Sequence, residues 1–459
     1  MKEKIRIASG QGFWGDLIEA PYNQVTKGNV DYLVMDYLAE VTMSILQKQK
    51  NKNPKLGYAR DLPELMQRIL PVCIEKKIKV ITNGGGVNAE ACAEAILQVA
   101  KSLSIKDLKV AVVLGDNIKD NIDSVISSGC ELNNMETGES ILKVKDKILS
   151  ANVYFGAMPI VQSLTQGADI VITGRTTDTG LTLAPMIYEF GWKETDYNLL
   201  SAGTIAGHIL ECGGQASGGN FLGDWKSIPN LEEIGFPIAE ASPDGEIIIT
   251  KHESLGGRVS FETIAEQLVY EIGDPKKYIT PDCVADFTSV QLNEIAPNRV
   301  KVFGITGAEP TEFYKVSCSY SDGYSASGSL TYSWPEALTK ARAADKILRS
   351  RLQKLNLEFD EIHTDLIGYD ACHGPLAVQI EEDKINEVML RVSVRGKDFN
   401  SIERFGKEIA PLILTGPPGV TGFAGGRPKP SEVVAYWPAL IPKKLVKPEV
   451  KIFSLKDIL

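Results

Sequence analysis

The stretch KVITNGGGVNAEACAEAILQVA, residues 79–100, joins a short apolar strand to an apolar helical pattern through three glycines. Short apolar strands that alternate with longer helical patterns are typical of a parallel sheet with helices on its faces. Five further apolar segments before residue 180 fit the same strand pattern, at 5–8, 32–36, 109–114, 153–155 and 169–173. We therefore predict an α/β fold whose N-terminal part is a mostly parallel sheet with flanking helices.

The regular alternation of expected strands and helices ends around Gly235, Phe236 and Pro237. The strands that we expect after this point come in blocks, with helices over 335–352 and 399–410. This order predicts a C-terminal α+β domain with antiparallel sheet. We expect two domains, 1–235 and 236–459, the second with a Gly/Pro-rich C-terminal loop over 415–430.

Composition excludes several classes of protein. The chain has 459 residues and a formal net charge of −10, without a segment that clusters Lys and Arg, so no nucleic-acid partner is expected. Seven cysteines without CxxC spacing indicate reduced thiols. The N-terminus enters a strand at once, and no apolar run approaches the ~18 residues that span a bilayer. We expect a cytoplasmic protein without a membrane partner.

Polar loops follow four of the expected strands. Because ligands bind at the carboxyl ends of strands in open α/β sheets, these loops should converge on one crevice. The Asn83 loop would either hold an anion at a helix N-terminus or make a plain tight turn. In the Gly174 loop, the Arg175 guanidinium matches a carboxylate or phosphate, and Asp178 would orient it or cap the helix. The candidate binding residues of these loops are Gly12, Asn83, Gly84, Gly85, Gly86, Asp116 and Arg175.

The densest cluster of reactive side chains is AGHILECGGQASGGNF, residues 206–221. A helix that ends at Gly213 would place His208 and Cys212 on one face, with Glu211 beside them. Three chemical interpretations stay open: Cys212 as a nucleophile assisted by His208, His208 and Glu211 as an acid and base pair above a packed Cys212, or a metal site. A fourth is a purely structural junction.

The metal interpretation requires Cys372 or His373 as additional ligands. Neither this pair nor the 206–221 stretch has a recognised ligand spacing, so we expect no metal. The rest of the stretch adds four candidate substrate-binding residues, Gln215, Gly218, Gly219 and Asn220.

Seven co-linear motifs carry a family resemblance. They are SGxGFxGD from residue 9, DYLVMDYLAE from 31, TNGGGVNAEACA from 82, GADIVITGRTTD from 167, AGHILECGGQASGGNF from 206, TKHESLGGRVS from 250 and GFAGGRPKPSE from 422. Over about residues 5–440 the chain resembles the acyclic terpene utilisation (AtuA) family. The resemblance implies a setting among acyl-CoA carboxylases and enoyl-CoA hydratases of branched acyl-CoA catabolism. Some relatives carry a small ferredoxin-like domain, so a separate small partner of that kind is expected here.

Together these observations predict a catabolic enzyme that acts on a carboxylate or a branched acyl-CoA, as a lyase, hydratase or hydrolase. His208 would handle protons, Glu211 would orient it or share that work, and Arg175 would hold a carboxylate. No nicotinamide fingerprint is present, and we expect no cofactor, a CoA thioester as substrate, and a homo-oligomer. The alternative is a non-catalytic ligand-binding or assembly subunit that serves an acyl-CoA carboxylase.

Overall fold

The computed structural model describes residues 2–421 and 425–458. The chain divides into two compact units, one of Met1–Ser319 with Tyr436–Leu459 and one of Tyr320–Ala435. The end of the regular alternation near residue 235 falls inside the first unit, because the strands on both sides of it belong to one sheet. Residues 422–424, which begin the last motif quoted above, lie outside the described residues.

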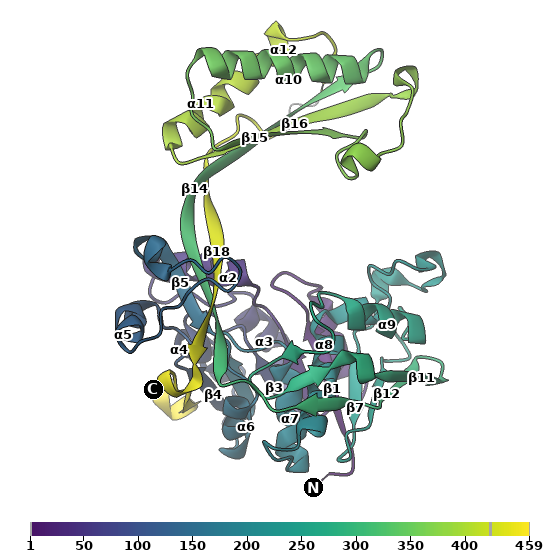
Figure 1. Ribbon diagram of the computed structural model, residues 1–459. Coiled ribbons are helices and arrows are strands. Elements are labelled where there is room, and N and C mark those ends of the chain that lie inside the picture. Colours follow the sequence, from purple (N-terminus) through teal and green to yellow (C-terminus); the bar gives the residue numbers. More distant parts are fainter. Residues whose placement is uncertain (1, 422–424, 459) are drawn as a thin grey trace. The chain divides into compact units, whose positions relative to one another are not determined.

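A ten-stranded mixed sheet forms the centre of the first unit, in the order β11-β12-β8-β7-β1-β2-β3-β6-β4-β19 (Figure 1). The neighbours from β1 to β4 in this order are parallel. Antiparallel strands extend the sheet at both ends. The α/β class with a mostly parallel N-terminal sheet is therefore confirmed. The strands are β1 (Ile5–Gln11), β2 (Tyr32–Met35), β3 (Lys79–Thr82), β4 (Lys109–Leu114), β6 (Ile170–Thr173), β7 (Ile238–Ala241), β8 (Ile247–Thr250), β11 (Gln291–Ala296), β12 (Arg299–Phe303) and β19 (Glu449–Ser454).

The two faces of this sheet are covered by different helices. Successive side chains of a strand point to opposite faces, and Leu33, Val80 and Val112 belong to one apolar core with α1 (Glu19–Thr26), α2 (Glu40–Lys52), α3 (Leu62–Lys76) and α4 (Ala89–Ser102). The alternate side chains are also buried, among them Ile81 and Val171. Helices α6 (Met158–Thr165), α7 (Gly180–Phe190) and α8 (Tyr197–Glu211) contact the strands of this sheet outside that core.

Further elements complete the first unit, and one of them, β14, continues into the second. A three-stranded sheet has the order β13-β10-β9, and α8 contacts two of its strands. Strand β5 pairs with β14 instead of joining the parallel sheet, unlike the other apolar segments of the N-terminal part. These elements are β5 (Ile148–Val153), β9 (Tyr278–Ile279), β10 (Val284–Asp286), β13 (Thr306–Ala308), β14 (Phe313–Ser333), α5 (Ile122–Ser127) and α9 (Phe261–Val269).

The second unit is an antiparallel sheet with helices on one face (Figure 1). Helices α10 (Ala337–Lys354) and α11 (Phe399–Ile409) pack their buried side chains onto β14, β15 (Glu361–Ile367) and β16 (Glu387–Gly396) in a core of their own. The remaining elements are α12 (Leu412–Thr415), β17 (Val420–Thr421) and β18 (Ser431–Pro442). Among residues 2–421 and 425–458, every helix is too short or too polar to cross a bilayer.

Candidate functional site

A cavity of about 440 Å³ in the first unit gathers four of the side chains expected from the sequence, Arg175, Asp178, His208 and Glu211. We call it the His208 cavity. It lies where the segments after β2, β5 and β6 meet α8, β9 and the start of β14. Its other lining residues are Glu40, Met135, Tyr154, Thr177, Glu271, Tyr278, Ile279, Thr280, Pro281, Thr311, Phe313, Lys315 and Leu440.

Helix α8 carries the reactive pair to this position by a close approach to the start of α7. A Cβ at Gly207 would lie 2.6 Å from the backbone of Thr179, so only glycine allows this packing. Gly12, the first of the expected binding residues, packs from the other side: a Cβ there would lie 2.9 Å from the carbonyl oxygen of Glu211. The predicted end of the helix is confirmed, since α8 stops at Glu211 and Gly213 has a left-handed φ of 55°.

His208 and Glu211 form a buried ion pair. Nδ1 of His208 lies 2.8 Å from Oε1 of Glu211, and the two side chains are 2 % and 14 % exposed. On the other side of the ring, Nε2 lies 3.0 Å from the carbonyl oxygen of Gln267. A carbonyl oxygen only accepts, so Nε2 carries a proton and donates it. Both ring nitrogens are thus engaged, and Nδ1 is the nitrogen that can exchange a proton with Glu211.

Gln267, on α9, fixes the position of His208 through both its backbone and its side chain. Its side-chain amide donates to the carbonyl oxygen of His208 at 3.0 Å, and its own side-chain oxygen accepts from Gln215 at 3.0 Å. Gln267 is fully buried. The expected residue Gln215 therefore takes part through Gln267 and does not line the cavity.

His208 and Glu211 each change the pKa of the other. Burial is the largest single influence on His208 and opposes its charged form, but the charge and hydrogen bond of Glu211, the carbonyl of Gln267 and the charge of Glu271 together raise the pKa of the imidazole above its usual value. Burial also raises the pKa of Glu211, against the effect of His208. The pair therefore retains a proton to a higher pH than either group would in water, as an acid or base working near neutrality requires.

Arg175 forms the opposite end of the cavity. Its side chain is 2 % exposed, and Nη1 donates to the carbonyl oxygen of Leu38 and, at 3.0 Å, to Asp178. The guanidinium stacks on the ring of Tyr154, 4.4 Å from its centroid. Among the described residues its Nε has no hydrogen-bond partner. Asp178 thus orients the arginine, which is one of the two roles considered from the sequence.

Asp116 supports the same loop from behind. Its Oδ2 accepts the backbone N–H of Arg175 at 2.9 Å and the side-chain amide of Asn152 at 2.9 Å. A Cβ at Gly174 would lie 2.6 Å from its carboxylate, so glycine is required there. Burial raises the pKa of Asp116 to about 6. Asp116 is therefore placed to position Arg175 and does not line the cavity.

Two cavity residues, Lys315 and Tyr154, lie outside the quoted motifs, and a third, Glu40, ends the motif that begins at residue 31 but was not expected in the site. Lys315 lies 5.1 Å from the Tyr154 ring centroid and 4.0 Å from Oε1 of Glu40. The hydroxyl of Tyr154 donates to the same Glu40 oxygen at 2.9 Å. Lys315 arrives from β14, more than a hundred residues after the strand-end loops, by the pairing of β14 with β5.

The Asn83 loop lies inside the protein. The Asn83 amide donates to Asp36 at 2.6 Å, and its side-chain oxygen accepts the N–H of Tyr37. The N–H groups of Gly84 and Gly86 already bond to Thr82 and to Asn83. A Cβ at Gly85 would meet the carbonyl oxygen of Thr173 at 2.6 Å, so that glycine allows two strand ends to touch. The contacts favour the tight-turn interpretation of this loop.

The remaining expected residues lie beyond the end of α8. Burial first, and then the charge of Glu211, raises the pKa of Cys212 to about 12, which disfavours a thiolate. The segment after it turns tightly: Gly218 has a φ of 95°, Gly219 bonds to Gly214, and Asn220 has a φ of 55°. None of these four residues lines the His208 cavity. Within the described parts of the chain, no three His, Cys, Asp or Glu side chains are grouped as metal ligands.

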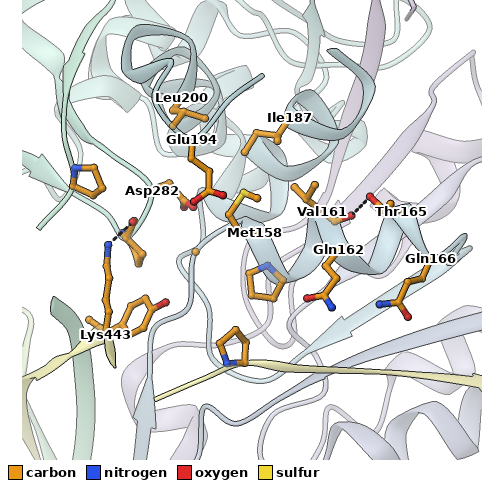
Figure 2. A pocket seen from close by; sticks show the side chains of 16 residues that line it. Met158, Val161, Gln162, Thr165, Gln166, Ile187, Glu194, Leu200, Asp282 and Lys443 are labelled. Atoms are coloured by element: carbon orange, nitrogen blue, oxygen red, sulfur yellow. Dashed lines mark hydrogen bonds between the residues drawn. The ribbon is translucent and has the colours of Figure 1, made fainter. Parts of the chain in front are cut away.

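A larger cavity, of about 570 Å³, shares only Pro281 with the His208 cavity (Figure 2). Its walls are largely apolar and include Met158, Ile187 and Leu200. Two carboxyl groups line it, those of Glu194 and Asp282; Asp282 accepts the N–H of Ala157 at 3.0 Å and thereby caps α6. No residue expected from the sequence lines it. The pair of His208 and Glu211 lines the His208 cavity and not this one.

Comparison with known proteins gives one match. The family model described as acyclic terpene utilisation family protein AtuA matches residues 5–452. No curated protein and no solved structure matches the chain.

Proposed function

Because the chain belongs to the acyclic terpene utilisation family AtuA, we propose that it is a catabolic enzyme that transfers a proton to or from a carboxylate or acyl-CoA substrate in the His208 cavity. The reaction would be that of a lyase, a hydratase or a hydrolase. The observation that carries the proposal is the buried pair of His208 and Glu211, which lines the same cavity as Arg175 and Lys315.

We assign the proton that reaches the substrate to Glu211. His208 donates through Nε2 to Gln267, and its Nδ1 faces Oε1 of Glu211 at 2.8 Å, so Glu211 lies next to the only ring nitrogen that is not already donating. Oε2 of Glu211 has no hydrogen-bond partner among the described residues. His208 would then store the proton and set the basicity of Glu211, which reverses the division of work expected from the sequence.

The cations at the opposite end suit an anionic group of the substrate. Arg175 is held in place by Asp178 and Tyr154, while the nearest carboxylate to the Lys315 ammonium is that of Glu40, at 4.0 Å. At this distance Glu40 neutralises the Lys315 ammonium only weakly, so its positive charge is available to attract an anionic ligand. The volume of about 440 Å³ suits a small carboxylate or the acyl end of a CoA thioester.

Turnover tests the proposal directly. We expect the purified protein to convert at least one member of a panel of branched enoyl-CoA and hydroxyacyl-CoA thioesters and their free acids. Glu211→Gln and His208→Ala should each lower kcat by about 10²-fold or more, because both remove the proton store. Cys212→Ser should leave kcat within about threefold, since this thiol does not line the cavity.

Two results would contradict the assignment. Full activity in Glu211→Gln would remove the proton-transfer role of the pair. Saturable binding of an acyl-CoA without turnover would instead support the alternative, a non-catalytic subunit of a carboxylase system. The homo-oligomer and the small ferredoxin-like partner stay predictions, which size-exclusion chromatography with light scattering can test.

A further inference from the structure

We propose that a second cavity of the first unit, built on the TKHESLGGRVS segment, binds the phosphate group of a small phosphorylated molecule. We call it the Lys251 cavity. It measures about 490 Å³ and shares no lining residue with the His208 cavity. It is lined by Arg6, Lys27, Glu240, Thr250, Lys251, His252, Glu253, Ser254, Pro297, Asn298 and Arg299.

The charge of this cavity is opposite to that of the whole chain. Four cations line it, Arg6, Lys27, Lys251 and Arg299, against the two carboxylates of Glu240 and Glu253. The chain as a whole has a formal net charge of −10. A concave site with an excess of cations attracts anions, and a phosphate monoester at neutral pH has nearly the two charges that would balance it.

Lys251 is the most informative of these cations because it is buried and no carboxylate of the described residues lies within ion-pair distance of it. The residue is 4 % exposed, and Nζ donates to the carbonyl oxygens of Leu255 at 2.5 Å and His252 at 3.3 Å. Among the described residues it forms no ion pair with a carboxylate. Burial lowers its pKa, and the charge of Glu253 only partly opposes this. Burying an unpaired ammonium is unfavourable, and an anion in the cavity would relieve that penalty.

Glu240 cannot neutralise the arginines by itself. Its two oxygens lie 2.6 Å from Nη2 of Arg299, 3.5 Å from Nε of Arg6 and 3.5 Å from Nζ of Lys4. One carboxylate is thus shared by three cations. Nε of Arg6 is buried and makes no hydrogen bond to the described residues. Guanidinium groups whose positive charge is not fully neutralised by a carboxylate are suited to bind phosphate oxygens.

The loop that presents Lys251 is fixed in place. Gly256 donates to Glu233 at 2.9 Å and accepts from Gly235 at 2.9 Å, and a Cβ at Gly256 would lie 2.0 Å from the carbonyl oxygen of Asn230. Nε2 of His252 bonds to the carbonyl oxygen of Gln24 at 3.1 Å. A preformed polar cavity of this volume exceeds inorganic phosphate in size, so we assign it a phosphate monoester with a small organic part.

Isothermal titration calorimetry at fixed ionic strength tests the assignment with inorganic phosphate, glycerol 3-phosphate and glycerol as probes. We expect saturable binding of both phosphates and none of glycerol. Lys251→Met should weaken glycerol 3-phosphate binding by about tenfold or more, because it removes the buried charge. Glu253→Gln should tighten binding several-fold; this side chain is exposed, so a gain cannot come from misfolding.

Matched variants separate the Lys251 cavity from other cations. Lys301→Met removes the same charge from β12 beside Arg299, where Lys301 pairs with Glu246 at 2.5 Å. Lys315→Met removes a cation from the His208 cavity. Both should leave binding within about twofold. The proposal is overturned if the wild-type protein binds neither phosphate at millimolar concentration, if Lys315→Met weakens binding and Lys251→Met does not, or if Glu253→Gln weakens it.

Discussion

At the scale of single residues, the proton shared by His208 and Glu211 makes a direct prediction. Burial, the largest influence on His208, lowers its pKa; Glu211→Gln removes the main opposing charge and leaves only the Gln267 carbonyl and the charge of Glu271 to raise this pKa. We expect the pKa of His208 to fall below the usual value for histidine. The chain contains only four histidines, so NMR titration of the imidazole signals is simple to assign by substitution.

His252 is the internal control for that titration. It is buried and has no carboxylate partner in the part of the chain that the structure describes, and its pKa is already lowered by burial. Glu211→Gln should leave the His252 curve unchanged. A His208 pKa that stays above its usual value in the variant would mean that Glu211 is not its electrostatic partner.

The residues that could be found from sequence share one property. Arg175, Asp178, His208 and Glu211 are polar side chains at strand or helix ends inside otherwise apolar segments, a pattern that is visible locally. Lys315 and Gln267 lie inside a strand and a helix, in local sequence that carries none of the quoted motifs. They reach the site through contacts between distant segments, β14 with β5 and α9 with α8, which no local pattern specifies.

At the scale of elements, the position of the pair depends on the packing of α8 against α7. Gly207→Ala would bring a methyl group 2.6 Å from the backbone of Thr179. Alanine favours a helix by up to about 1 kcal/mol over glycine, but the overlap with backbone cannot be relieved by a side-chain rotation. We expect a net loss of about 1–3 kcal/mol in the free energy of unfolding, measured by urea denaturation.

Gly273→Ala is the matched substitution, because no atom lies within 4 Å of a Cβ there. It should change stability by less than about 0.5 kcal/mol. If Gly207→Ala is as stable as Gly273→Ala, the close approach of the two helices is not what holds His208 in the site.

Most strands of the central sheet could be predicted, because apolar runs of four to seven residues followed by glycine or polar loops are distinctive. Which strands pair with each other could not be predicted. The segment near 153 has the same apolar character as its neighbours, yet β5 pairs with β14. Strand β14 runs from Phe313 to Ser333 through Asp322 and Gly323, although Gly323 has a φ of 92°, so this turn-like pair of residues does not end the strand. Register and neighbours are set by tertiary packing, which local propensity does not contain.

At the scale of the whole molecule, the division into units follows β14 and not the end of the regular alternation near residue 235. The antiparallel strands β7 and β8 come after residue 235 but extend the sheet through pairing with β1, which keeps them in the first unit. The second unit, 320–435, has its own core beneath α10 and α11. The first unit holds both cavities for which a ligand is proposed, so substitutions in the core of the second unit are not expected to change their chemistry directly.

The buried carboxyl groups of the first unit predict how the stability of the protein depends on pH. Burial raises the pKa of Asp116 to about 6, well above the 3.8 of an ordinary aspartate. Between these two values the folded state binds more protons than the unfolded state, so stability is greatest at the acidic side and falls as the pH rises. Burial raises the pKa of Asp282 to about 6 as well. Paired carboxylates such as Glu240 have lowered pKa values and are ionised in both states above pH 5.

We therefore expect the free energy of unfolding, measured by urea denaturation, to fall between about pH 5 and pH 7, by about 1 kcal/mol for Asp116 alone. Asp116→Asn should remove that part of the slope, since the amide does not titrate. Asp123→Asn, at a carboxylate exposed on α5, is the matched control and should leave the slope unchanged. An equal slope in Asp116→Asn would show that Asp116 is ionised at little cost. The N–H groups of Arg175 and Asn152 would then stabilise the carboxylate more strongly than burial opposes it.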